Sequence, residues 1–134
     1  MYSHKISCKK EKLVEIREFV HDVLKQMKLP DLEVNTMVLA VDEVCANLII
    51  HSHQCNPKDH LELRITPSST TVTFEIVDYG MGFNIDKYEE PKLHDIVKSR
   101  RKGGIGLMLV RRIMDKVEYI KGSNHNIYRL SKNL

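Results

Sequence analysis

A helix that is apolar on almost every side is the feature that most constrains how this chain folds. It is predicted over residues 31–53, and in its second half the polar exceptions are Asp42, Glu43, Asn47 and His51. A helix that is apolar nearly all round is buried in the core of its domain. Glu43, Asn47 and His51 follow one another at i, i+4 and i+8, a spacing that places them along one ridge. Because buried polar groups need partners, something polar is expected to dock on this ridge.

The rest of the pattern predicts a mixed domain around that helix. Predicted helices cover residues 9–28 and about 103–116, and predicted strands cover residues 2–8, 61–66, 71–78, 117–121 and 127–130. Ser7 and Asp31 are the expected N-caps of the first two helices. The two central strands alternate apolar and polar residues, which predicts an antiparallel sheet covered by helices on one face.

Bulk properties narrow the class of protein. With 134 residues, 42% hydrophobic and 29% charged, the chain is expected to be one soluble globular domain, residues 1–134. The net charge of +3 comes from well-spread basic residues, which argues against a dedicated nucleic-acid binder. No signal peptide and no apolar run of roughly 20 residues is evident, so no membrane span is expected. Cys8, Cys45 and Cys55 show no paired spacing, so we expect reduced thiols and a cytoplasmic protein.

Glu43 and Asn47 are one helical turn apart. A carboxylate in an apolar setting can have a raised pKa and act as a general base. An amide oxygen one turn on can bind Mg²⁺, which prefers oxygen ligands. The alternative is an ordinary capped or salt-bridged pair, because this spacing is common by chance.

Asp78-x-Gly80-x-Gly82 directly follows a predicted strand. Its carboxylate can accept a hydrogen bond from an exocyclic amine such as that of adenine. The two glycines allow the backbone to approach a flat ring closely. A simple tight turn is the alternative interpretation.

Gly103, Gly104 and Gly106 open the last predicted helix. Free N–H groups and the positive end of the helix dipole at such a position favour phosphate. A loop that needs glycine to turn is the alternative. The preceding Lys98–Lys102 run is either a solvated charge run or a source of contacts to the γ-phosphate or to a partner protein.

His51, His53 and Cys55 invite a zinc interpretation. Residues two apart on a helix point to nearly opposite sides, so these side chains would not share one ion unless the helix ended by His51. Structural zinc is therefore disfavoured.

Taken in order, these segments resemble the GHKL ATPase superfamily, named for gyrase, Hsp90, histidine kinases and MutL. Within it, the chain is most similar to the bacterial anti-sigma factor serine kinases. Asn47-Leu-Ile-Ile-His51 resembles the end of the first sequence box, and Asp78-Tyr-Gly-Met-Gly-Phe83 resembles the second. Gly103-Gly-Ile-Gly-Leu107 with Val110–Asp115 resembles the third box and its downstream helix. The resemblance covers nearly the whole chain.

The resemblance implies an α+β fold, a two-layer α/β sandwich of the Bergerat type. Its mostly antiparallel sheet would be covered on one face by three helices. It also implies ATP and Mg²⁺ as cofactors and a mobile lid at about residues 83–102. By analogy Asp78 binds the adenine amine, Asn47 holds Mg²⁺ and Glu43 is the base that activates the attacking hydroxyl. The other residues expected to contact ATP are His51, Gly80, Gly82, Lys102, Gly103, Gly104, Ile105, Gly106 and Leu107, with N–H groups at Gly104 and Gly106 on the phosphates.

The implied function is an ATP-dependent protein serine kinase and anti-sigma factor. Its implied partners are an anti-anti-sigma protein of the STAS type, which it phosphorylates, and a sigma factor; a homodimer is also compatible. Direct contact with nucleic acid or a membrane is not expected. The alternatives are a non-catalytic, nucleotide-gated binding module and a stand-alone histidine-kinase-type ATP-binding domain. Asn84-Ile85 and the Gly122–Asn126 turn depart from the family pattern and leave lid chemistry and partner identity open.

Overall fold

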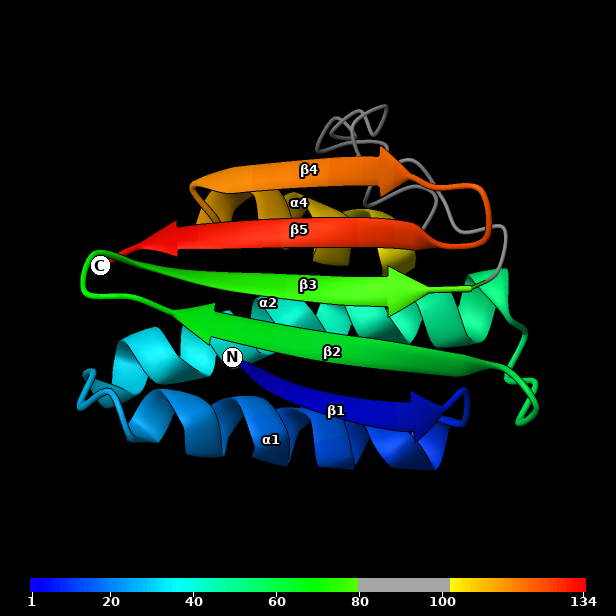
Figure 1. Cartoon of the computed structure of the whole chain (residues 1–134), viewed down its shortest axis with the longest axis horizontal. Coiled ribbons are helices and arrows are strands. Elements are labelled where there is room, and N and C mark those ends of the chain that lie inside the picture. Colours follow the sequence, from blue (N-terminus) through cyan, green and yellow to red (C-terminus); the bar gives the residue numbers. More distant parts are fainter. Residues whose placement is uncertain (80–101) are drawn as a thin grey trace.

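The computed structural model describes residues 1–79 and 102–134, with side chains from Gly106 onward in the second range. Within these ranges, five strands form one antiparallel sheet in the order β1-β2-β3-β5-β4. The strands are β1 (Tyr2–Ser7), β2 (His60–Pro67), β3 (Thr71–Asp78), β4 (Lys116–Lys121) and β5 (Asn126–Asn133). Helices α1 (Leu13–Lys25), α2 (Asp31–Asn47) and α4 (Lys102–Ile113) cover one face of the sheet (Figure 1). The predicted fold class is confirmed.

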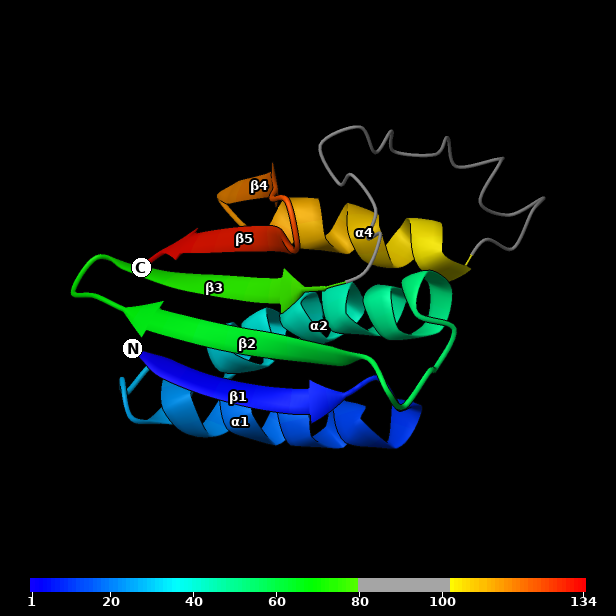
Figure 2. The same ribbon diagram turned by 45° about the vertical axis from the view of Figure 1, so that its right-hand side comes forward.

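The core lies between α2 and the strands β2 and β3, whose alternation of apolar and polar residues was predicted. Leu63 pairs with Ile76 and Ile65 with Phe74 across β2 and β3, and all four side chains are buried on the helix side. Figure 2 shows α1, α2 and α4 side by side behind the sheet, with α2 in the middle. The C-terminal ends of β3 and α2 and the N-terminal end of α4 therefore lie at the same edge of the two layers.

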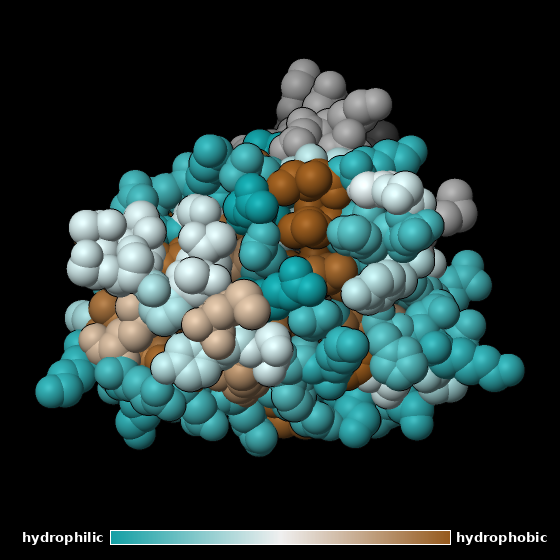
Figure 3. All heavy atoms as spheres, in the orientation of Figure 1, coloured by the Kyte–Doolittle hydropathy of each residue, from teal (hydrophilic) through white to brown (hydrophobic). Residues whose placement is uncertain are grey.

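The other face of the sheet carries no described helix. Figure 3 shows this face as mainly hydrophilic, with one apolar strip. Val77, Ile127 and Ile120 are register partners across three strands of this face. Next to them Arg129 on β5 bridges two carboxylates, Glu75 at 2.9 Å and Glu118 at 3.9 Å.

The central helix continues past Asn47 into a π-helical turn, η2 (Leu48–Ser52). By length and composition alone, Asp31–Ser52 is apolar enough to cross a membrane, contrary to the expectation that no such segment exists. This is weak evidence, because the core helix of a globular protein passes the same test. Val41, Val44 and Leu48 are fully buried inside the fold, so burial in the core accounts for the apolar composition.

The start of the first helix differs from the prediction. Ser7 is the last residue of β1 and not an N-cap, because the chain stays extended until Cys8, whose N–H donates to the carbonyl of Asp59 at 2.9 Å. A 3₁₀ turn, η1 (Lys10–Lys12), then leads into α1. Asp31 is likewise the first residue of α2 and not its cap; Pro30 holds the N-cap position, and its carbonyl accepts the Val34 N–H at 3.1 Å.

Candidate nucleotide site

Glu43 lies on α2 where α4 crosses it. A Cβ atom added to Gly106 would lie 2.0 Å from the Glu43 Oε2 atom, so the carboxylate rests against the backbone of α4 where a side chain is missing. Burial, and secondarily the charge of Asp42, raise the pKa of Glu43. A half-buried carboxylate with a raised pKa has the properties of a general base.

Asn47 is the last residue of α2 and is 9% exposed. Its Nδ2 atom donates to the backbone carbonyl of Glu43 at 2.7 Å. That bond uses the amide nitrogen of Asn47 as the donor and holds the side chain in place, while the Oδ1 atom is an acceptor. Asn47 therefore offers a fixed oxygen one turn from Glu43, which is the kind of ligand that Mg²⁺ prefers.

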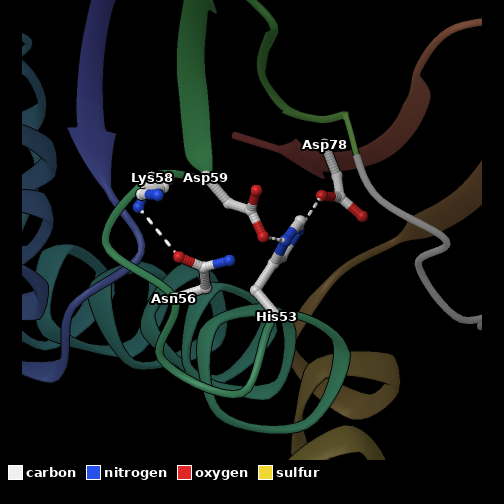
Figure 4. A network of polar contacts seen from close by, with 5 residues as sticks. All are labelled: His53, Asn56, Lys58, Asp59 and Asp78. Atoms are coloured by element: carbon white, nitrogen blue, oxygen red, sulfur yellow. Dashed lines mark hydrogen bonds and ion pairs between the residues drawn. The ribbon is translucent and has the colours of Figure 1, made fainter.

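Asp78 ends β3 and is completely buried. Figure 4 shows the His53 ring between the carboxylates of Asp78 and Asp59. The His53 Nε2 atom bonds the Oδ1 atom of Asp78, and its Nδ1 atom bonds the Oδ2 atom of Asp59 at 2.8 Å. The expected adenine-binding carboxylate is thus part of a hydrogen-bonded cluster, which we call the Asp78 cluster (Asp59, His53 and Asp78).

The His53 ring owes its place to the turn after α2. The His53 N–H donates to the Leu48 carbonyl at 2.9 Å, the i to i+5 bond of the π turn, and the Cys55 N–H donates to the Ile49 carbonyl at 2.8 Å. Gln54 and Cys55 both have positive φ angles, 50° and 57°. This tight reversal brings the chain back to β2 and places Asp59 beside the ring.

The π turn also changes the predicted polar ridge. It adds one residue to the helical turn, so His51 no longer follows Glu43 and Asn47 at the α-helical spacing. His51 is exposed, whereas His53 is 7% exposed and contacts Asp78. Sequence reasoning considered His53 only as a zinc ligand. The available signal for its role was its position in the turn that leads back to β2, the strand that pairs with Asp78 on β3.

The third segment lies at the start of α4, as predicted. Lys102, Gly103, Gly104 and Ile105 form its first turn, whose N–H groups have no partner within a helix. Gly106 comes after these four residues, so its contact with Glu43 accounts for the missing side chain better than a phosphate contact does. The Leu107 side chain packs in the core. Gly80, Gly82 and the predicted lid, apart from Lys102, lie outside the described residues.

Metal ligands of the zinc type are not gathered anywhere among the described residues, since no group of three His, Cys, Asp or Glu side chains could hold an ion there. Burial, followed by the charges of Asp59 and Asp78, raises the pKa of Cys8 to about 12, so this thiol stays protonated. The residues present fit Mg²⁺-ATP better: one buried carboxylate, one fixed amide oxygen and a glycine-rich helix start.

Comparisons with known proteins identify the family and the fold. A family model described as a histidine kinase-like ATPase domain matches residues 6–132. A curated relative, the serine-protein kinase RsbW of Halalkalibacterium halodurans, is 24% identical over 118 residues, which cover 84% of this chain and 71% of that protein.

Two solved structures share the fold at 10% sequence identity. The structure of the SiaB-SiaC complex from Pseudomonas aeruginosa matches with a TM-score of 0.67 over 100% of this chain and 90% of that one. The structure of the RsbU and RsbW domains of Rv1364c from Mycobacterium tuberculosis matches with a TM-score of 0.62 over 98% of this chain and 32% of that one. With the family model matching almost its whole length, the chain belongs to the histidine kinase-like ATPase domain family.

Proposed function

We propose that this chain binds Mg²⁺-ATP and transfers the γ-phosphoryl group to a serine of a partner protein. The observation that carries the proposal is the placement of Glu43. This half-buried carboxylate with a raised pKa lies one turn from Asn47 and against α4, the helix whose glycine-rich start is suited to phosphate. A base next to a phosphate site is what activation of a hydroxyl nucleophile requires.

Each end of the nucleotide has a matching group in this proposal. Asp78 accepts a hydrogen bond from the adenine amine, since a carboxylate offers about four lone-pair sites and His53 uses one of them. The N–H groups of the first turn of α4 bind phosphate oxygens. Asn47 Oδ1 holds Mg²⁺, which neutralises phosphate charge when it is bound.

Glu43 acts on the attacking group. Its carboxylate accepts the proton of the serine hydroxyl while the serine Oγ forms a bond to the γ-phosphorus, and the bond from that phosphorus to the bridging oxygen of ADP breaks. Only ionised Glu43 accepts the proton. The rate of transfer should therefore rise with pH through the raised pKa of Glu43.

The partner class rests on relatives alone. The curated relative is named a serine-protein kinase, and one structural neighbour was solved as a two-protein complex. By analogy with the anti-sigma factor kinases, we propose a serine on a STAS-type anti-anti-sigma protein as acceptor and a sigma factor as second partner. A cytoplasmic location and a homodimer belong to the same proposal.

The test is phosphotransfer from γ-labelled Mg²⁺-ATP to STAS-type proteins of the source organism. An acid-stable label on serine supports the proposal. An acid-labile label indicates transfer to histidine and contradicts it. Nucleotide-dependent association with the STAS-type protein in the absence of any label would instead favour the non-catalytic, nucleotide-gated module.

A further inference from the structure

His53 joins the buried carboxylate of the candidate nucleotide site, Asp78, to the solvent-exposed carboxylate of Asp59. Its Nε2 side faces Asp78, which is 0% exposed, and its Nδ1 side faces Asp59, whose side chain is 42% exposed. Asp59 and His53 line a surface pocket of about 440 Å³ at the edge of the sheet. The Asp78 cluster therefore has a buried carboxylate at one end and a carboxylate exposed to water at the other.

The protonation state of His53 follows from its two partners. An ionised carboxylate only accepts hydrogen bonds, so an imidazolium that donates from both nitrogens satisfies Asp59 and Asp78 together. Burial lowers the pKa of His53, but the hydrogen bonds and charges of Asp59 and Asp78 outweigh burial and raise it overall. The same bonds hold the ring in one orientation.

Charged and titratable groups from several elements surround the ring. Around the pocket and the cluster lie Lys5 and Cys8 at the end of β1, Cys55 and Lys58 in the loop, His60 and Glu62 on β2, and Tyr79 after β3. The two lysines line the outer pocket, whereas His53 has direct bonds to the two aspartates. Among these described groups, Asp59 and Asp78 therefore set the charge of the ring.

We propose that His53 is a positioning residue for the adenine ring of the nucleotide. Held at both nitrogens, the protonated His53 ring fixes the Asp78 carboxylate so that it accepts the hydrogen bond from the exocyclic amine. When the ring loses a proton and becomes neutral, nucleotide affinity falls. A neutral ring has one N–H. Because the Asp59 carboxylate can hydrogen-bond to water and the Asp78 carboxylate is buried, the remaining proton stays on Nε2, toward Asp78. The hydrogen bond from Nδ1 to Asp59 is then lost. Asp78 then exchanges an ion pair with the imidazolium for a hydrogen bond from neutral imidazole, in which only the carboxylate is charged. This inference rests on the proposed binding of ATP.

The experiment measures two midpoints in the full chain. Titration of the His53 ring by ¹⁵N NMR without nucleotide gives its protonation midpoint, and calorimetric titration with Mg²⁺-ADP from pH 6 to 9.5 gives the affinity profile. We expect affinity to fall about three- to tenfold as pH rises, with its midpoint at that of His53. Asp59→Asn keeps an acceptor but removes the outer charge, so both midpoints should move together to lower pH.

His53→Gln should remove the pH-dependent loss and weaken binding about tenfold at pH 7. His60→Gln is the matched control, because His60 is an exposed histidine on the same pocket, and this variant should keep the wild-type profile. A nucleotide affinity that is unchanged both by pH and by His53→Gln would overturn the positioning role of His53 but not the proposed binding of ATP. Absence of binding by wild type at every pH would overturn the proposed function and this inference with it.

Discussion

The two ends of the candidate site are built by different physical means. At one end, which we call the Glu43 end (Glu43, Asn47 and Gly106), the absence of a side chain at Gly106 leaves room for the Glu43 carboxylate. At the other end, the Asp78 cluster is held by hydrogen bonds between charged groups. The first arrangement is steric and the second is electrostatic. Substitutions that change side-chain volume should therefore disturb the Glu43 end, and changes of charge or pH should disturb the Asp78 cluster.

The largest effect is expected from Glu43→Gln. The amide keeps the shape of the side chain but cannot accept the serine proton, so phosphotransfer should fall about 10²- to 10⁴-fold, while binding of Mg²⁺-ATP stays within about threefold. Asp42→Asn is the matched control on the preceding residue, because Asp42 pairs with Arg17 of α1 at 3.1 Å and affects Glu43 through its charge, which contributes to the raised pKa of Glu43. Equal loss in both variants, or unchanged transfer in Glu43→Gln, would refute the assignment of the base.

Gly106→Ala tests the steric part of the comparison. The new methyl group would displace the Glu43 carboxylate, which is the flexible end of a side chain and can move. Transfer should fall up to about 10²-fold, as displacement of a reacting group by about 1 Å can cause. Stability should change by less than about 1 kcal/mol, because alanine also favours the helix by about that amount.

A double variant shows whether Glu43 and Gly106 act together. Adding Gly106→Ala to Glu43→Gln should cost no further transfer activity, since the base is already absent. Additive losses would show that Gly106 acts through something other than Glu43.

Asp78→Asn tests the electrostatic part. It removes the charge that His53 faces inside the fold, so affinity for ATP should fall at least about tenfold, a change of about 1.4 kcal/mol. The free energy of unfolding should fall by about 1 to 3 kcal/mol, measured by urea denaturation. Asp59→Asn should cost less stability, because the Asp59 side chain is 42% exposed. A larger loss at Asp59 would reverse our order of the two contacts.

The smallest effect is the dependence of stability on pH. Because the folded-state pKa of His53 is raised above its unfolded value of about 6.5, the stabilisation from its pairing is complete below that value. It is lost as pH rises through the raised pKa. The free energy of unfolding of wild type minus that of His53→Gln should decline over this window. A flat difference would mean that the ring is not charged in the folded protein.

Much of this architecture could be predicted from local patterns. Alternation of Leu61, Leu63 and Ile65 gave a strand buried on one face, and the apolar second half of α2 gave a core helix. Glu43 lies on the core helix, Asp78 ends a strand and Gly103, Gly104 and Gly106 lie at the start of α4, as predicted. These predictions depend only on periodicity and on neighbours in sequence.

The contacts within the site could not be predicted in this way. The Asp78 cluster needs a π turn at Leu48–Ser52, and nothing in that apolar stretch distinguishes it from a continuing α-helix. It also needs the register that pairs Leu61 with Asp78, which brings Asp59 and Asp78 to the same end of the sheet. The reason for Gly106 likewise depends on how closely α4 packs on α2.

The central claim is that both ends belong to one Mg²⁺-ATP site. The most direct measurement is the change of backbone and side-chain NMR signals on titration with Mg²⁺-ATP and, separately, with adenosine. The account predicts that Mg²⁺-ATP shifts the signals of His53 and Tyr79 together with those of Asn47 and Gly106, with one dissociation constant, whereas adenosine shifts the first pair far more than the second. Shifts at one end alone with Mg²⁺-ATP, or two different dissociation constants, would contradict it.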